Sequence, residues 1–302
     1  MPFKIKDFSE LLKTTYNEWS DKDPFRQSAV IAYYAIFSIP GLMVLVITIA
    51  GYFFGKDAVH ENIMAQVSST MGADTATQMG EMLKNATQSK STIWGSIIGV
   101  ITILIGATGV FVELQITLNA IWQVKVVAKK GILPILRARF FSFGLILAIA
   151  FLLMISLVIS TALAAASDLL KGYTSDFTII VFNIINFIFS LAVIAMLFAL
   201  MFKILPDARI EWKHVWLGSV LTGLLFTIGK TALAFYFSKA EPASVYGAAG
   251  SIILLLLWVS YSSMILFFGA EFTAAFAKKY TGKVPPTEIA KVESAETAKK
   301  NL

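Results

Sequence analysis

Long uncharged apolar stretches, separated by polar connections, dominate the pattern along this chain. The clearest runs from Tyr246 to Thr273, YGAAGSIILLLLWVSYSSMILFFGAEFT, and carries no charge between Ser251 and Ala270. About 20 residues at a rise of 1.5 Å cross a hydrocarbon core of roughly 30 Å. This stretch therefore predicts a membrane-spanning helix with a glycine-rich start and an acid near its end.

The same pattern recurs and predicts six transmembrane helices within one membrane domain, residues 25–277. The second of them is expected to continue as helix as far as Trp122. We therefore expect an all-α, polytopic membrane protein. The expected spans are about 29–54, 93–114, 140–166, 178–202, 215–237 and 251–272.

The other segments are polar or mixed. Apolar residues at mostly helical spacing among lysines and acids predict an N-terminal interfacial amphipathic helix in residues 1–24. Residues 55–92 read as an extracytoplasmic loop whose apolar positions, three and four residues apart, predict short surface helices. The tail, 278–302, contains Pro285-Pro286 and scattered charges, so we expect a disordered cytoplasmic segment.

Proline and glycine mark special backbone positions. Asp23-Pro24 is expected to supply an N-cap and a first-turn proline for the first span. Pro40 and Gly41 lie inside that span, where proline frees a carbonyl, so a kink is predicted near Ser38. In the second span, small residues predict close helix packing, and they are Gly95, Gly99, Gly106 and Gly109.

Composition places the chain in the membrane class. Hydrophobic residues make up 57% and charged residues only 15%, too little polar surface to coat a water-soluble globule. The net charge of +6 would suggest nucleic acid in a soluble domain, but here its distribution matters more, and we expect membrane lipids as partners and no nucleic acid.

Lysine and arginine set the expected orientation. Of the 25 in the chain, 19 fall in the two terminal segments and the second and fourth connections, whereas five fall in the other connections. Positive residues favour the cytoplasmic side. We therefore expect both termini in the cytoplasm and a location in the bacterial cytoplasmic (inner) membrane.

Catalysis has little support in the sequence. Cysteine is absent, which excludes a thiol nucleophile and a Cys-based metal site. The two histidines, His60 and His214, are expected on opposite sides of the membrane. No GxSxG, HExxH or GxxxxGKS motif is present. We expect no catalytic residues, no metal and no cofactor, and therefore not an enzyme.

Polar residues within the spans are the candidates for function, and depth divides them into two groups. The inner group, near the cytoplasmic ends, is expected to form a polar vestibule. Its members are Tyr33, Tyr34, Ser38, Glu113, Asn119, Ser263 and Glu271.

The outer group lies near the opposite face and comprises Asn183, Asn186 and Lys230. Because Lys230 and Glu271 are expected at opposite depths, they should not form a direct ion pair. The start of the last span is a further candidate, where backbone N–H groups would meet an anionic headgroup. Its residues are Tyr246, Gly247, Gly250 and Ser251.

Structural roles remain open for each candidate. Lys230 can extend along its own stem toward the interface. Glu271 can anchor the bundle by pairing with Arg26 or with a loop arginine. The tyrosines can be packing residues, and Ser and Asn can bond their own backbone or a neighbour. The glycine-rich start can be a tight return of the chain into the bundle.

Three stretches resemble the YihY/virulence factor BrkB family of bacterial inner-membrane proteins. They are DPFRQSAVIAYYAIFSIPGL (Asp23 to Leu42), LPDARIEWKHVWLGSVLTGLLF (Leu205 to Phe226), and YGAAGS followed by LLLLWVSYSSMILFFGAEFT. The resemblance covers nearly the whole chain apart from the tail and the first outer loop. It implies a six-helix inner-membrane protein and supplies no catalytic residues to carry over.

The resemblance also brings functional labels. Family members carry a ribonuclease BN label, which this sequence does not support, and an association with serum resistance, while some relatives are linked with export of lipid or lipopolysaccharide precursors. We expect a secondary transporter or flippase for an amphiphilic, lipid-like or anionic substrate. The alternative is a scaffold for envelope proteins that transports nothing. A membrane ribonuclease is a distant third and would require His60 or His214.

Overall fold

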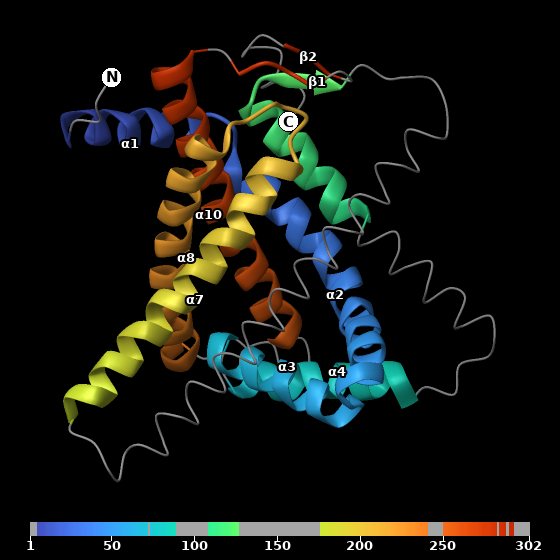
Figure 1. The fold of residues 1–302 in the computed structure, drawn as a ribbon. Coiled ribbons are helices and arrows are strands. Elements are labelled where there is room, and N and C mark those ends of the chain that lie inside the picture. The colour runs from blue at the N-terminus through green and yellow to red at the C-terminus, as the bar shows by residue number, and fades with distance from the viewer. Residues whose placement is uncertain are drawn as a thin grey trace.

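The structure, a computed structural model, describes residues 5–71, 73–88, 108–126, 176–240, 250–282, 284–287 and 290–292. Within these ranges the protein is predominantly helical (Figure 1). The third expected span, 140–166, lies outside the described residues, as does most of the second, 93–114.

Four long helices form the described bundle, and their bounds are α2 (Pro24–Phe54), α7 (Asp176–Ile204), α8 (Trp212–Ala240) and α10 (Gly250–Thr281). Three of them, α7, α8 and α10, are long and apolar enough to cross a membrane. Successive helices run in alternating directions (Figure 1). Helix α10 packs against both α2 and α8, and α7 packs against α8. Helix α10 therefore lies between α2 and α8 in the described bundle.

Helix α2 begins where Asp23-Pro24 predicts a helix start. The Asp23 side chain accepts a hydrogen bond from the N–H of Arg26, and Pro24 occupies the first turn, so the predicted N-cap and first-turn proline are confirmed. The helix is continuous through Pro40 and Gly41, and the kink expected near Ser38 stays a prediction. Gly55, with a φ of 87°, ends α2 in a backbone conformation that suits glycine.

One end of the bundle is covered by two helices, α3 (Lys56–Met71) and α4 (Ala73–Gln88). They lie across the long helices in Figure 1. Helices were predicted in this segment and are confirmed, and with 16 residues each they form a helical cap. The extracytoplasmic location of the segment stays a prediction. Met79 of α4 is buried against Leu255 of α10, which explains why the apolar positions recur.

The opposite end carries a small antiparallel sheet of β1 (Val124–Val126) and β2 (Ala290–Val292), and we call it the sheet end. The all-α prediction is therefore wrong in this detail. The prediction of a disordered tail is also wrong for part of 278–302, because α10 continues to Thr281 and β2 pairs with β1. Val124 of β1 is buried, and valine favours strands. The strand is only three residues long and lies near several lysines, so the sequence gave little sign of it.

The N-terminal helix, α1 (Ile5–Ser20), lies across the end of α10 at the sheet end (Figure 1). Leu11 is buried there, and the rings of Phe8 and Phe272 meet edge to face with centroids 5.9 Å apart. The helix predicted in residues 1–24 is confirmed, and apolar residues on it pack against α10. Its interfacial position stays a prediction.

Close to α1, residues from most of the described helices pack into one cluster. Residues of this cluster include Ile31, Leu118, Phe202, Val215 and Phe267. They come from α2, the helix Thr108–Ile121, α7, α8 and α10 in turn. The described helices are therefore packed against one another near the sheet end.

Candidate functional site

A buried ion pair joins α10 to the turn between α1 and α2. The Lys22 ammonium donates a hydrogen bond to Glu271 Oε1, and the two side chains are only 8% and 1% exposed. Among the described residues, the other carboxylate oxygen, Oε2, has no hydrogen-bond partner. Burying charges is costly, so a buried pair with spare hydrogen-bonding capacity is a strong candidate for function.

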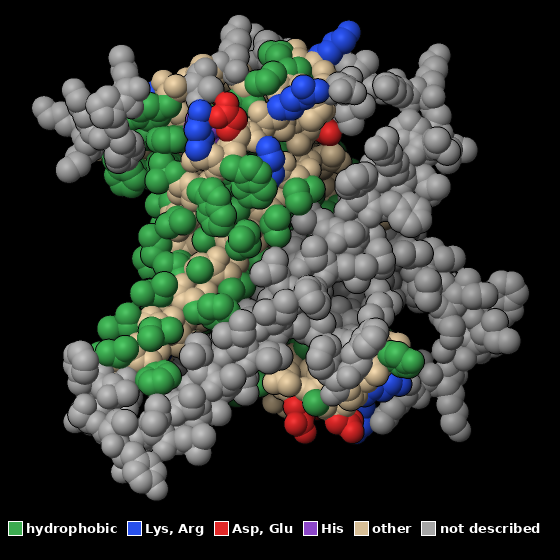
Figure 2. Space-filling view, viewed as in Figure 1, with side chains coloured by type: hydrophobic (Ala, Val, Ile, Leu, Met, Phe, Trp, Pro, Cys, Tyr) green, Lys and Arg blue, Asp and Glu red, His purple; other side chains and the backbone are tan. Residues whose placement is uncertain are grey.

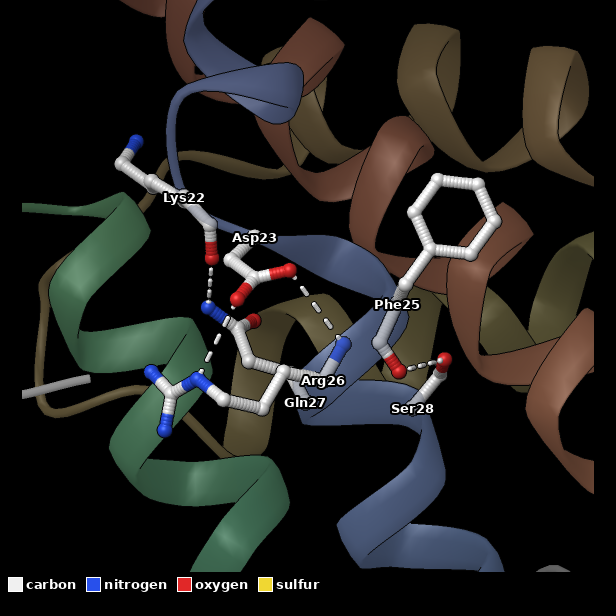
Figure 3. A network of polar contacts seen from close by, with 6 residues as sticks. All are labelled: Lys22, Asp23, Phe25, Arg26, Gln27 and Ser28. Atoms are coloured by element: carbon white, nitrogen blue, oxygen red, sulfur yellow. Dashed lines mark hydrogen bonds and ion pairs between the residues drawn. The ribbon is translucent and has the colours of Figure 1, made fainter.

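The turn itself holds Lys22 in place. Asp23 has a φ of 50°, in the left-handed region, which turns the chain sharply between α1 and α2. The Gln27 side-chain amide donates to the Lys22 carbonyl. Figure 3 shows the Lys22 ammonium directed away from Asp23 and Arg26, which leaves it to Glu271.

Two further contacts stabilise the turn between α1 and α2. Trp19 donates its indole N–H to the Met264 carbonyl at 3.2 Å, which ties α1 to α10 about two turns from Glu271. Arg26 Nε lies 3.3 Å from Asp23 Oδ2, and both side chains are more than half exposed. If Glu271 anchors the bundle, it was expected to pair with Arg26 or with a loop arginine. That expectation is wrong, because Glu271 pairs with Lys22, and Arg26 pairs with Asp23, the N-cap of its own helix.

A second polar junction lies at the sheet end, around Asp207 in the connection between α7 and α8. Asn119 donates its amide to Asp207 Oδ2 at 2.9 Å and accepts the Asp207 backbone N–H at 2.7 Å. Gln115 donates to the same oxygen at 3.0 Å. The Asp207 carbonyl accepts the N–H of Thr287 at 3.0 Å. Asp207 therefore joins three chain segments.

The other inner candidates divide among different roles. Ser38 is buried and donates to the Ala35 carbonyl of its own helix. Tyr33 is 59% exposed, and its ring contacts those of Tyr34 and Phe37. Ser263 is buried. Ser38 and Ser263 lie near the middle of α2 and α10, and the described contacts of these three residues do not combine them into one vestibule.

Glu113 and Tyr34 lie where α2 meets the helix Thr108–Ile121. A Cβ added to Gly109 would lie 2.4 Å from Tyr34 Cδ1, so the small-residue contact expected at Gly109 is present on a tyrosine. Glu113 is half-buried and interacts electrostatically with Arg26. Gly95, Gly99 and Gly106 lie outside the described residues.

The outer candidates lie toward the other end. Lys230 on α8 and Asn186 on α7 are both half-buried, whereas the side chain of Asn183 lies outside the described part. Gly223 packs against Ala195 between these antiparallel helices, and following that register places Lys230 and Asn186 within about one turn in depth. Of the glycine-rich start, Tyr246 and Gly247 lie outside the described residues, and Gly250 and Ser251 begin α10.

The two groups are well separated in depth. On α8, Gly229 lies against Tyr261 of α10, because a Cβ there would overlap the Tyr261 hydroxyl. Lys230 is therefore level with Tyr261, and Glu271 lies about 15 Å further along α10. This agrees with the expectation that Lys230 and Glu271 do not pair directly.

The described residues hold no group of His, Cys, Asp or Glu arranged to bind a metal ion. His60 lies on α3, whereas His214 lies in the first turn of α8 at the sheet end, so the two imidazoles are at opposite ends of the bundle (Figure 1).

Lys22 and Asp207 were not among the residues singled out from the sequence. Lys22 precedes the Asp23-Pro24 helix start, and only the sharp turn there directs it back to α10. Asp207 directly follows Pro206, and this proline gave the local signal that a helix ends here. That signal says nothing of the contacts that Asp207 makes.

Comparison with known proteins identifies the family. The family described as virulence factor BrkB matches residues 15–293, most of the chain. The chain belongs to the virulence factor BrkB family. The resemblance seen in the sequence is thereby confirmed, and Lys22, Asp207 and Glu271 all lie within the matched region.

Several curated relatives of this BrkB-family chain are named UPF0761 membrane proteins. One from Saccharophagus degradans is 26% identical over 268 residues, 87% of this chain and 59% of the relative. One from Pseudoalteromonas atlantica is 27% identical over 249 residues, 80% and 78% of the two chains. One from Pseudomonas aeruginosa is 25% identical over 259 residues, 83% and 58% of the two chains.

The chain thus spans less than two thirds of the length of the Saccharophagus and Pseudomonas relatives. No solved structure matches it. The names of the relatives and the apolar helices agree that this is a membrane protein.

Proposed function

We propose that this BrkB-family protein is a secondary transporter or flippase that moves an amphiphilic, lipid-like or anionic substrate across the bacterial inner membrane. The observation that carries the proposal is the buried Lys22–Glu271 pair between α10 and the α1–α2 turn. Ionisable residues inside a membrane bundle are costly, and they commonly line substrate or proton pathways.

The proposed topology has six spans with both termini in the cytoplasm, and α1 lies near the cytoplasmic surface. Charge supports it, because basic residues in the described part gather at the sheet end, as positive residues do on the cytoplasmic side. At the sheet end they are Lys13, Lys22, Arg26, Lys125, Lys203, Arg209, Lys213, Lys278, Lys279 and Lys291. At the α3–α4 end they are Lys56, Lys84 and Lys239.

The ion pair gives the transport proposal a physical step. An anionic group of the substrate competes with Glu271 for the Lys22 ammonium. A buried carboxylate that loses its partner is costly, and taking up a proton removes that cost. Substrate binding at Lys22 would therefore be coupled to protonation of Glu271, with protons as the coupling ion.

Reconstitution into liposomes tests this function. Wild-type protein should move a fluorescently labelled anionic lipid between leaflets, faster with a proton gradient, while Glu271→Gln should abolish the gradient dependence. Glu61→Gln, which neutralises an exposed acid on α3, is the matched control and should behave as wild type. Protein that moves neither labelled lipid nor protons, with or without a gradient, would contradict the proposal.

A scaffold for envelope proteins is the second candidate, and the α3–α4 cap favours it. This cap is a packed helix pair at the end proposed to face outward, and it exposes charged side chains such as Asp57, Glu61 and Lys84. A scaffold would lose its partners in crosslinking when residues 56–88 are shortened, whereas Glu271→Gln protein that remains folded would keep those partners. In either role we infer no catalytic activity for the chain.

A further inference from the structure

The connection between α7 and α8 brings basic side chains next to an exposed apolar surface. Lys203 lies in the last turn of α7 and Lys213 in the first turn of α8. Figure 2 shows Lys and Arg side chains at this end of the molecule, above a band of hydrophobic side chains. We call this region, residues 203–220, the α7–α8 corner. Its exposed apolar residues are Ile204, Trp212, Trp216, Leu217 and Val220.

Aromatic rings connect the basic level to the apolar surface. The Lys203 ammonium lies 5.8 Å from the centroid of the Trp212 ring and also donates to the Ile210 carbonyl. The Trp212 and Trp216 rings follow one another along α8, with centroids 6.3 Å apart. Exposed tryptophans beside lysines are typical of the level where a protein meets lipid headgroups.

One exposed acid, Glu211, lies among these cations. Its carboxylate is 2.6 Å from the Lys213 ammonium, and the two side chains are 56% and 64% exposed. The hydrogen bond from Lys213 holds the pKa of Glu211 below its usual value, so Glu211 is ionised at neutral pH. Ion pairs this exposed are weak, so an external anion can compete with Glu211 for Lys213.

We propose that the α7–α8 corner binds the headgroup of an anionic phospholipid, with its phosphate at Lys203 and Lys213 and its acyl chains along Trp212, Trp216 and Val220. Charge complementarity favours an anionic headgroup over a zwitterionic one. The apolar residues directly below the lysines favour a lipid over a soluble anion, which would use the lysines alone. This site is separate from Lys22 and Glu271 and does not depend on transport.

Tryptophan quenching by brominated lipids tests the site in the full chain. The protein is reconstituted in vesicles of phosphatidylcholine that contain an equal small fraction of either brominated phosphatidylglycerol or brominated phosphatidylcholine. Brominated phosphatidylglycerol should quench more strongly, and Trp212→Phe with Trp216→Phe should remove the excess. Equal quenching by the two brominated lipids would overturn the proposal.

Charge variants sharpen the test. Lys213→Gln should reduce the preference for phosphatidylglycerol about fivefold, as should Lys203→Gln. Glu211→Gln should increase it, a result that a purely structural role of Glu211 would not give. Lys239→Gln, at the other end of α8, should leave it unchanged. An unchanged preference in Lys213→Gln, or a decrease in Glu211→Gln, would contradict the proposal.

A soluble-anion control separates the two sources of phosphate. Inorganic phosphate, added in place of chloride at matched ionic strength, should leave most of the preference for phosphatidylglycerol, because phosphate makes no contact with the tryptophans. If phosphate abolishes the preference, the corner binds soluble anions and the lipid proposal fails.

Discussion

Gly218 of α8 and Thr273 of α10 lie so close that a Cβ added to Gly218 would be 1.7 Å from Thr273 Oγ1. The relationship is reciprocal, because a Cβ added to Gly269 of α10 would be 1.8 Å from Thr222 Oγ1 of α8. Each threonine donates its hydroxyl to the carbonyl of the glycine one turn earlier in its own helix. Glycine and threonine thus interlock, and the two backbones come into close contact.

Replacing Gly269 by alanine should therefore destabilise the protein by about 1–3 kcal/mol, since the added methyl group forces Thr222 to move in a packed interface. Thermal unfolding in detergent, followed by tryptophan fluorescence, measures the change. Gly80→Ala is the matched control, because among the described residues its Cβ would contact Met64 Sδ alone, at an ordinary 3.7 Å.

A double variant separates steric overlap from a general loss of helix flexibility. Thr222 donates within its own helix, so Thr222→Ala breaks no hydrogen bond between helices. Adding Thr222→Ala to Gly269→Ala should recover much of the lost stability. If the double variant instead loses as much stability as the two single variants together, the contact between Gly269 and Thr222 does not set the distance between α8 and α10.

The Lys22–Glu271 pair leads to a second prediction. Lys22→Met leaves a buried carboxylate without its partner and should destabilise the fold by about 3–5 kcal/mol. Replacing both residues by methionine should restore stability to within about 1 kcal/mol of wild type or better, because no buried charge remains. Thermal unfolding of the two variants and wild type at neutral pH measures both effects.

The double variant also separates structure from function. A stable Lys22→Met/Glu271→Met protein that no longer moves labelled lipid would agree with a role of the pair in transport. A stable double variant that transports as well as wild type would limit the pair to anchoring α1 and α2 on α10.

The sequence predicted what depends on helical period and hydrophobicity. The bounds of α7 and α8 lie within three residues of the expected spans, and Asp23-Pro24 begins α2 as its chemistry requires. The partners of polar residues were beyond the sequence, because Lys22 and Glu271 are 249 positions apart. The tail was missed for a related reason, since β2 is ordered by pairing with β1 and has little local signal of its own.

A third prediction concerns the junction at Asp207. Asn119→Ala removes two hydrogen bonds from Asp207, one of them to its carboxylate, and should cost about 1.5–3 kcal/mol of stability. Hydrogen exchange should rise at Thr287, whose N–H donates to the Asp207 carbonyl. Both effects follow if Asp207 holds the α7–α8 connection and the C-terminal segment together.

The same helix offers a control for Asn119. Thr117 is fully buried, and among the described residues its hydroxyl has no hydrogen-bond partner. Thr117→Val should therefore be neutral or slightly stabilising, within about 0.5–1 kcal/mol. Equal losses in Thr117→Val and Asn119→Ala would indicate that packing, and not the hydrogen bonds to Asp207, stabilises this end.

The absence of cysteine allows a direct test of topology. Ser20→Cys at the end of α1 and Glu61→Cys on α3 place single thiols at exposed positions at opposite ends of the bundle. A membrane-impermeant maleimide should label Glu61→Cys in intact spheroplasts and Ser20→Cys only in inverted membrane vesicles, because positive residues gather around Ser20. The reverse pattern would invert the proposed orientation, and it would place the Lys22–Glu271 pair near the outer leaflet, where an exporter would release its substrate.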